Sequence, residues 1–174
     1  MAEGIRILPV RGLPEVAPGD DLAAMIAGAT ELANGDVLVV TQKVVSKAEG
    51  RLVDIDLELG HKPLVESESV RVLRRRGDLV ISETAHGFVC ANAGVDLSNV
   101  AEGTAALLPV APDRSARRIR DALRRYVGME VAVVISDTFG RPWRRGVTDV
   151  AIGCSGLRPI INLRGTVDAL GREL

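Results

Sequence analysis

Cysteine, histidine and aromatic residues are scarce in this sequence of 174 residues. The two cysteines, Cys90 and Cys154, lie far apart within apolar runs, which gives neither a zinc-finger spacing nor a disulfide framework. Aromatic residues make up only 2% of the chain, so few side chains could stack on nucleobases. This composition counts against a single-stranded nucleic-acid binder and fits a reducing cytoplasm.

Neither sign of charge dominates, because 22 lysines and arginines face 23 aspartates and glutamates. The net pull toward nucleic acid or an anionic membrane is therefore weak, and any phosphate binding must be local. No apolar run approaches the roughly 20 residues of a membrane span, and no signal peptide is evident. We expect a soluble protein with neither nucleic acid nor membrane as a partner.

The usual nucleotide, zinc and hydrolase signatures are also missing, including the Walker A, dinucleotide-binding and H-E-x-x-H motifs. The only histidines, His61 and His86, are interpreted as surface or turn residues rather than as catalytic bases.

Apolar periodicity predicts an α+β fold of mixed sheets with flanking helices. Asp20 or Asp21 can cap a helix that stops at Asn34-Gly35. The run 37–41 has the pattern of a strand buried on both faces, and 79–82 with 87–91 forms a hairpin. Further strands are predicted at 5–10 and 131–135, and further helices at 66–75 and 113–126.

Asp137 and Thr138 follow the predicted strand 131–135 directly. A carboxylate and a hydroxyl on such a rigid support suit a hard cation such as Mg²⁺ or Mn²⁺. The alternative is that both residues only cap a turn and that Arg141, Arg144 and Arg145 form solvated surface. Both interpretations stay open at this point.

Two other segments carry polar groups after a strand. The loop 91–100 presents Asp96, Ser98 and Asn99, which could hold a metal or a phosphate or could form an ordinary Asx turn. Lys43 and Lys47 follow the strand 37–41, where ammonium groups suit phosphate but could equally line a solvated helix face.

Six segments in order resemble the coenzyme F-420 γ-glutamyl ligase family. They are LPVRGLPEVAPGDDL, NGDVLVVTQKVVSKAEGR, ANAGVDLSNV, ALLPVAPDRSA, VAVVISDTFGRPWRRGVTDVAIG and the terminal GREL. The resemblance implies that GTP is hydrolysed to GDP while an amide forms between L-glutamate and the terminal carboxylate of coenzyme F-420-0. An acyl phosphate, divalent Mg or Mn ions, a monovalent cation such as K⁺ and a homodimer are implied as well.

The resemblance also assigns roles to individual residues. Asp96 and Asp137 correspond to catalytic ligands of one divalent ion, and Thr138 corresponds to a ligand of a second. The nucleotide contacts implied in the same way are Leu13, Pro14, Glu15, Val16, Gln42, Lys47 and Asn99.

The sequence departs from the family pattern in two places. The stretch between Arg51 and Glu66 is short, and family members continue past the GREL segment through a region that supplies a further acidic metal ligand. We therefore expect residues 1–174 to form an incomplete ligase domain. The alternative is a non-catalytic module of the same fold that binds nucleotide or dimerises.

Overall fold

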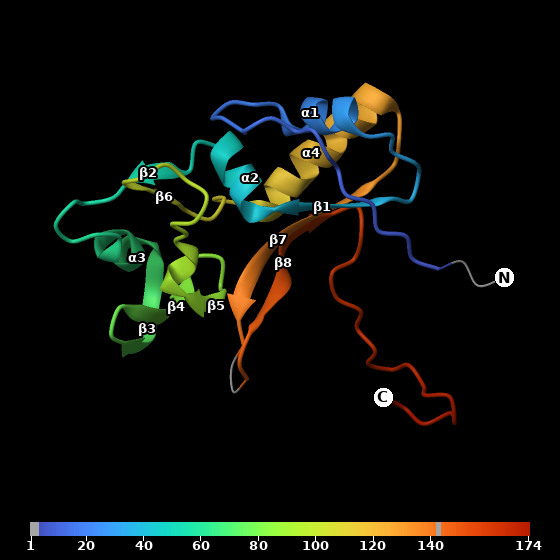
Figure 1. Cartoon of the computed structure of the whole chain (residues 1–174). Helices are drawn as coiled ribbons and strands as arrows, with labels where there is room; N and C mark the ends of the chain where they lie inside the picture. The colour runs from blue at the N-terminus through green and yellow to red at the C-terminus, as the bar shows by residue number, and fades with distance from the viewer. Residues whose placement is uncertain (1–3, 142–143) are drawn as a thin grey trace.

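The computed structural model describes residues 4–141 and 144–174. Its largest sheet has the strand order β1-β7-β8 and consists of β1 (Val37–Thr41), β7 (Ala132–Gly140) and β8 (Val147–Ser155). β1 and β7 run parallel and β8 is antiparallel to β7. The helices α1 (Leu22–Ala29), α2 (Gln42–Ala48) and α4 (Pro112–Val127) lie along this sheet (Figure 1).

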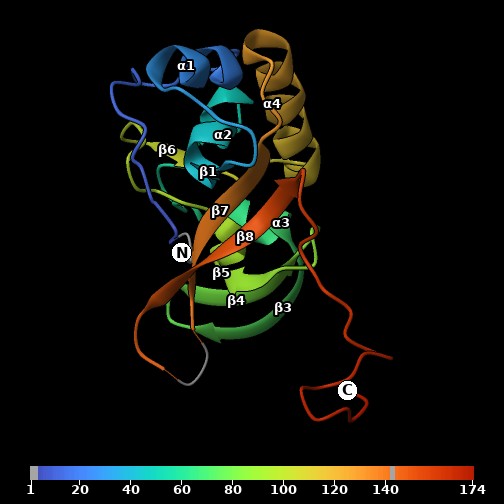
Figure 2. The same ribbon diagram turned by 90° about the vertical axis from the view of Figure 1, so that its right-hand side faces the viewer.

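Two smaller sheets complete the fold and lie to the left of β7 in Figure 1; Figure 2 shows β3, β4 and β5 from a second side. The first pairs β2 (Leu52–Asp54) with β6 (Thr104–Ala106). The second has the order β3-β4-β5 and contains β3 (Ser69–Arg76), β4 (Leu79–Thr84) and β5 (Val89–Ala91), next to α3 (Lys62–Glu68) and the short 3-10 helix η1 (Asn92–Gly94). The predicted α+β class is confirmed.

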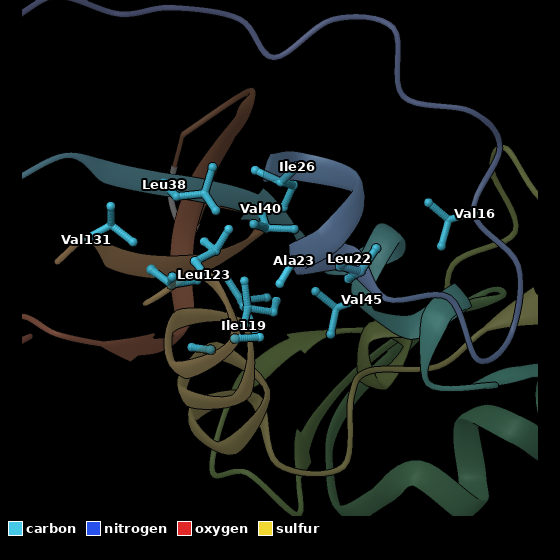
Figure 3. Packing of buried hydrophobic residues seen from close by; sticks show 14 of the residues in the cluster. Val16, Leu22, Ala23, Ile26, Leu38, Val40, Val45, Ile119, Leu123 and Val131 are labelled. Atoms are coloured by element: carbon cyan, nitrogen blue, oxygen red, sulfur yellow. The ribbon is translucent and has the colours of Figure 1, made fainter. Parts of the chain in front are cut away.

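The core lies between α1, α4 and one face of the main sheet. Figure 3 shows Ile26 from α1, Val40 from β1 and Leu123 from α4 pointing toward one another. These side chains are aliphatic, as expected from a chain with so few aromatic residues. Apolar burial of this kind contributes roughly 25 cal/mol per Å², so this layer holds the main sheet in place.

Helix α1 begins where the sequence predicted, since Asp21 is its N-cap and accepts a hydrogen bond from the Ala24 amide at 3.1 Å. It ends at Ala29, before the predicted stop at Asn34-Gly35. Helix α4 ends at Gly128, whose positive φ of 70° suits glycine. The hairpin of β4 and β5 is also confirmed.

The helix predicted over 66–75 is wrong. Helix α3 ends at Glu68, and β3 follows immediately as an antiparallel partner of β4. Gly77 has a positive φ of 60° and forms the turn between the two strands, where the sequence suggested the end of a helix. Pairing with β4 therefore outweighs the helical spacing of Val70 and Leu73.

Three strand predictions also need correction. Residues 5–10 form no strand, and Ile5 and Ile7 are exposed. Strand β1 is buried on one face only, because Val37 and Val39 are 55% and 60% exposed on the other. Strand β7 continues to Gly140, so residues 137 and 138 lie within a ladder with β8, a strand that the sequence analysis missed.

No helix in the described part of the chain is long and apolar enough to cross a membrane. Both cysteines are free.

Close packing of α4 against β8 leaves no room for a side chain at Gly153. A Cβ atom there would lie 2.4 Å from the backbone carbon of Pro112. We expect Gly153→Ala to lower the free energy of unfolding by about 1–3 kcal/mol, because backbone rather than a flexible side chain must move. Chemical denaturation monitored by circular dichroism measures this change.

Gly28 is the matched control. It lies in α1, and a Cβ atom added there would have no other atom within 4 Å, so Gly28→Ala should leave the protein as stable or stabilise it slightly. Equal stability of the two variants would contradict the close approach at Gly153.

Candidate functional site

A cleft of about 860 Å³ opens at one end of the main sheet. Its walls come from the β1–α2 junction, from the segment 90–99 and from the outer half of the β7–β8 hairpin. Strand β5 packs against β7 at this place (Figure 2). The polar side chains that line the cleft are Thr41, Gln42, Lys43, His61, Asn92, Asp96, Ser98, Asn99, Ser136, Asp137, Thr138 and Asp149.

Parallel pairing of β1 with β7 brings the β1–α2 junction next to the β7–β8 hairpin. Thr41 at the end of β1 is the register partner of Ser136 in β7. Because parallel strands end at the same edge of a sheet, Lys43 and Asp137 come to adjoining positions although they are distant in sequence. A rigid sheet therefore fixes two of the three walls.

Backbone hydrogen bonds fix the third wall. The amide of Asp96 donates to the carbonyl of Ala106 at 2.9 Å, and the amide of Ala106 donates back at 2.8 Å. Ala106 belongs to β6, whose partner strand β2 carries Leu52. Asp96 thus projects from an anchored segment, although the sequence placed it in a loop.

Asp96 is held by Lys43 and Ser98. The Lys43 ammonium lies 2.7 Å from Oδ2 of Asp96, while Oδ1 accepts hydrogen bonds from the amide and the hydroxyl of Ser98, each at 2.8 Å. Burial alone would raise the pKa of Asp96, but the hydrogen bonds from Lys43 and Ser98 hold it below its ordinary value. Asp96 is therefore ionised at neutral pH.

Asp137 has the opposite electrostatic character. Burial raises its pKa above the ordinary value, and the charges of Asp96 and Asp149 raise it further against the lowering effects of the Thr138 amide and Lys43. Asp96 and Asp137 line the same cleft. The structure brings together the two acidic residues that the sequence analysis paired, and their metal-binding role stays a prediction.

Thr138 lies beside Asp137 in β7 and donates a hydrogen bond from its hydroxyl to Oδ1 of Asp149 at 2.7 Å. Asp149 is its register partner in β8. The sequence analysis missed Asp149, although an acidic residue inside the β-branched run 147–150 was a signal for it. Successive strand residues point to opposite faces, so Asp137 and Thr138 do not converge on one point.

A divalent ion fits the chemistry of this cleft. The charges of Asp96 and Asp149 raise the pKa of Asp137, which a nearby cation would offset, and oxygen donors suit Mg²⁺ or Mn²⁺. Within 4–141 and 144–174, no three acidic, histidine or cysteine side chains gather closely enough to enclose an ion.

The predicted nucleotide contacts fall into two places. Asn99 lines the cleft, with a positive φ of 50° that asparagine tolerates. Gln42 also borders the cleft, but its amide is buried and donates to Ser46 at 2.8 Å and to the Leu107 carbonyl at 3.1 Å. The side-chain amide of Gln42 is thus engaged within the fold.

The remaining predicted contacts lie next to one another outside the cleft lining. Lys47 on α2 forms an ion pair with Glu15, which joins the 13–16 segment to that helix. In this segment Pro14 is exposed, Leu13 is half-buried and Val16 is buried in the core.

The arginines of the β7–β8 turn are exposed. Arg141 donates to the carbonyl of Arg145 at 3.4 Å, and Arg144 is exposed beside it. Pro142 and Trp143, which belong to the same family-like segment, lie outside the described residues. Among the described residues, these arginines have no hydrogen bond or ion pair with a cleft-lining side chain.

Cys90 and His61 line the cleft, whereas His86 lies outside its lining. Burial, with a smaller effect of the Asp137 charge, raises the pKa of the Cys90 thiol to about 11. His61 lies in a turn before α3, as predicted, and borders the cleft. His86 forms the β4–β5 turn, where its Nε2 lies 2.8 Å from the Pro109 carbonyl.

Known proteins resemble this chain over most of its length. Residues 12–174 match the family described as F420-0:Gamma-glutamyl ligase. The chain is similar to proteins named Coenzyme F420:L-glutamate ligase. The relative from Methanothermobacter thermautotrophicus is 44% identical, over 98% of this chain and 76% of its own length. The relative from Methanopyrus kandleri is 45% identical, over 98% and 74%.

A third relative of the same name, from Archaeoglobus fulgidus, is 38% identical over 98% of this chain and 74% of its own length. The matched region contains every wall of the cleft, from β1 to β8. The chain therefore belongs to the F420-0:gamma-glutamyl ligase family.

Proposed function

We propose that this protein is a GTP-dependent ligase that joins L-glutamate to the terminal carboxylate of coenzyme F-420-0 through an amide bond. The observation that carries the proposal is the cleft in which Asp96 and Asp137 face each other from distant parts of the chain. The names of the similar proteins support the same acceptor and amino acid.

The proposed reaction has two steps. An oxygen of the coenzyme carboxylate attacks the γ-phosphorus of GTP, the bond to the β-phosphate oxygen breaks, and GDP leaves. The glutamate amine then attacks the carbon of the acyl phosphate, and inorganic phosphate leaves while the amine releases a proton to solvent. Because the carboxylate is itself the first nucleophile, positioning and charge neutralisation matter more than a protein base.

In this proposal Asp96 and Asp137 hold one divalent ion and Thr138 holds a second. When bound, Mg²⁺ or Mn²⁺ neutralises the charge that develops on the transferred phosphoryl oxygens. The hydrogen bonds from Ser98 fix the Asp96 carboxylate for this task. The half-buried position of Asp137 limits the access of bulk water to its side chain.

The nucleotide is assigned to the cleft and the adjoining surface of α2. Asn99 lies at the cleft, and the Glu15–Lys47 ion pair places the 13–16 segment beside the same helix. Glu15 and Lys47, which are 32 positions apart in sequence, thus come into contact. We also include a bound monovalent cation such as K⁺ in this proposal.

Purified protein with GTP, Mg²⁺ or Mn²⁺, L-glutamate and F-420-0 should yield a glutamylated coenzyme, GDP and phosphate. Asp137→Asn should reduce the rate at least about 100-fold, because the amide cannot supply the charge of a carboxylate. Mass spectrometry of the coenzyme product measures the outcome.

Asp78→Asn is the control for that experiment, since Asp78 is exposed in the β3–β4 turn and pairs with Lys62. The rate of the Asp78→Asn variant should match the rate of the parent protein. Full activity of Asp137→Asn, or no product from folded parent protein with every substrate present, would overturn the proposal.

The charge of Asp137 should lower the stability of the fold while it serves the proposed metal binding. A raised pKa means that the ionised carboxylate destabilises the fold, so Asp137→Asn should raise the melting temperature by a few degrees at pH 7 without metal. The gain should fade toward pH values below about 4, where aspartate is protonated in both the folded and the unfolded states. Calorimetry in a chelating buffer measures this, and a melting temperature that falls at pH 7 would contradict the environment assigned to Asp137.

We also propose that the protein is a homodimer that uses the uncovered face of the main sheet. Val37 and Val39 are exposed there, and Val134 and Cys154 continue the face in register with Val39. An exposed apolar surface on an edge strand favours association with a second copy.

Val39→Lys should convert the dimer into a monomer in sedimentation velocity experiments, because a charge would be buried at the interface. Val70→Lys is the matched control, since Val70 is 69% exposed on β3 and outside this face. A parent protein that sediments as a monomer at micromolar concentration would exclude the proposed interface.

A further inference from the structure

Lys43 is the only lysine or arginine among the cleft-lining residues that the structure describes. Its ammonium contacts Oδ2 of Asp96 at 2.7 Å and the hydroxyl of Ser98 at 2.6 Å, and it also donates to the Ser98 carbonyl. An ammonium group has three N–H donors, so all of them are engaged. With 16% of its side chain exposed, Lys43 is largely withdrawn from solvent.

The Lys43 ammonium contacts Oδ2 of Asp96, the oxygen atom that a metal ion would need. Oδ1 of Asp96 already accepts two hydrogen bonds from Ser98, which leaves Oδ2 as the freer oxygen, and Lys43 holds it. The charge of Lys43 also acts on Asp137, the second acidic wall of the cleft. An ammonium and a divalent cation repel each other strongly at such short range.

We propose that a divalent metal ion displaces Lys43 from Asp96, and that the released ammonium then binds a phosphate group of the nucleotide. This inference rests on the proposed function and adds an order of assembly to it. Lys43 acts as the cation of the metal-free cleft, and it becomes a phosphate-binding residue only after the metal has arrived.

The chemistry of the lysine side chain suits both the contact with Asp96 and the proposed contact with phosphate. Lysine carries a compact charge on a flexible four-carbon stem, so its ammonium can change partners without movement of α2. Phosphate oxygens are acceptors comparable to the carboxylate that the ammonium gives up. Since binding free energies are linked, the metal should strengthen nucleotide binding, and the nucleotide should strengthen metal binding by the same factor.

The test on the unchanged protein is amine acylation followed by peptide mass spectrometry. Addition of Mn²⁺ alone should raise the acylation rate of Lys43 about fivefold or more, because the ammonium is freed, and further addition of GDP should lower it again. Lys62 is the internal reference, since its side chain is 63% exposed and it lies outside the cleft lining.

Electron paramagnetic resonance on the same samples reports whether Mn²⁺ is bound. Bound Mn²⁺ without an increase in Lys43 acylation would overturn the displacement and leave the proposed ligase function intact. No Mn²⁺ binding, with or without GDP, would count against both. Protection of Lys43 by Mn²⁺ would show that the lysine stays on Asp96.

The matched substitution is Lys43→Met, which keeps the aliphatic stem and removes the charge. We expect its dissociation constant for Mn²⁺ to fall about tenfold, since the ion no longer competes with an ammonium, and its GDP affinity in Mn²⁺ to fall. Lys62→Met carries the same loss of charge and should change the Mn²⁺ affinity less than about twofold.

A weaker affinity of Lys43→Met for Mn²⁺ would mean that Lys43 orients Asp96 instead, and it would overturn the proposal. Circular dichroism checks the fold of the variant, because Lys43 joins α2 to the segment around Ser98. If the variant does not fold, the acylation experiment on the parent protein decides the question.

Discussion

The parallel pairing of β1 with β7 is the constraint on which the cleft depends. It aligns Thr41 with Ser136, and the residues that follow, Lys43 after β1 and Asp137 within β7, inherit their separation from that register. Aliphatic packing of α1 and α4 beneath the sheet keeps the two strands in place. A shift of one residue would turn the buried face outward and remove Asp137 from the cleft.

The position of the third wall of the cleft, the segment 90–99, depends on a contact between two of the few aromatic residues. Phe88 next to β5 packs edge-to-face on Phe139 of β7, with ring centroids 6.0 Å apart. His86 stacks on Phe88, with ring centroids 5.7 Å apart. Aromatic pairs of this kind add about 0.5–1.5 kcal/mol beyond area burial. They help to hold the small sheet, and with it the segment of Asp96, against the strand of Asp137.

Much of this arrangement was accessible from the sequence where local signals agree with the tertiary structure. Capping by Asp21, the amphipathic pattern of α4 and the apolar run of β7 each specify an element without help from distant residues. The pairing of Asp96 with Asp137 came from the family resemblance, because spacing alone left an ordinary turn as an alternative for each.

The sequence failed where long-range pairing decides the outcome. β3 carries arginines and valines at a spacing that also fits a helix, and only the presence of β4 makes it a strand. Strand β8 was missed, and Asp149 with it, because that acidic residue and Gly153 weaken its pattern. The contact of Lys43 with Ser98 was likewise not predicted, since it spans 55 positions.

The buried thiol of Cys90 bears on the fidelity of the proposed chemistry. An activated acyl group is vulnerable to any competing nucleophile, and a thiolate would divert it into a thioester. With a pKa of about 11, Cys90 remains a neutral and weakly nucleophilic thiol at physiological pH. Burial thus lets a cysteine border the cleft without intercepting the intermediate meant for glutamate.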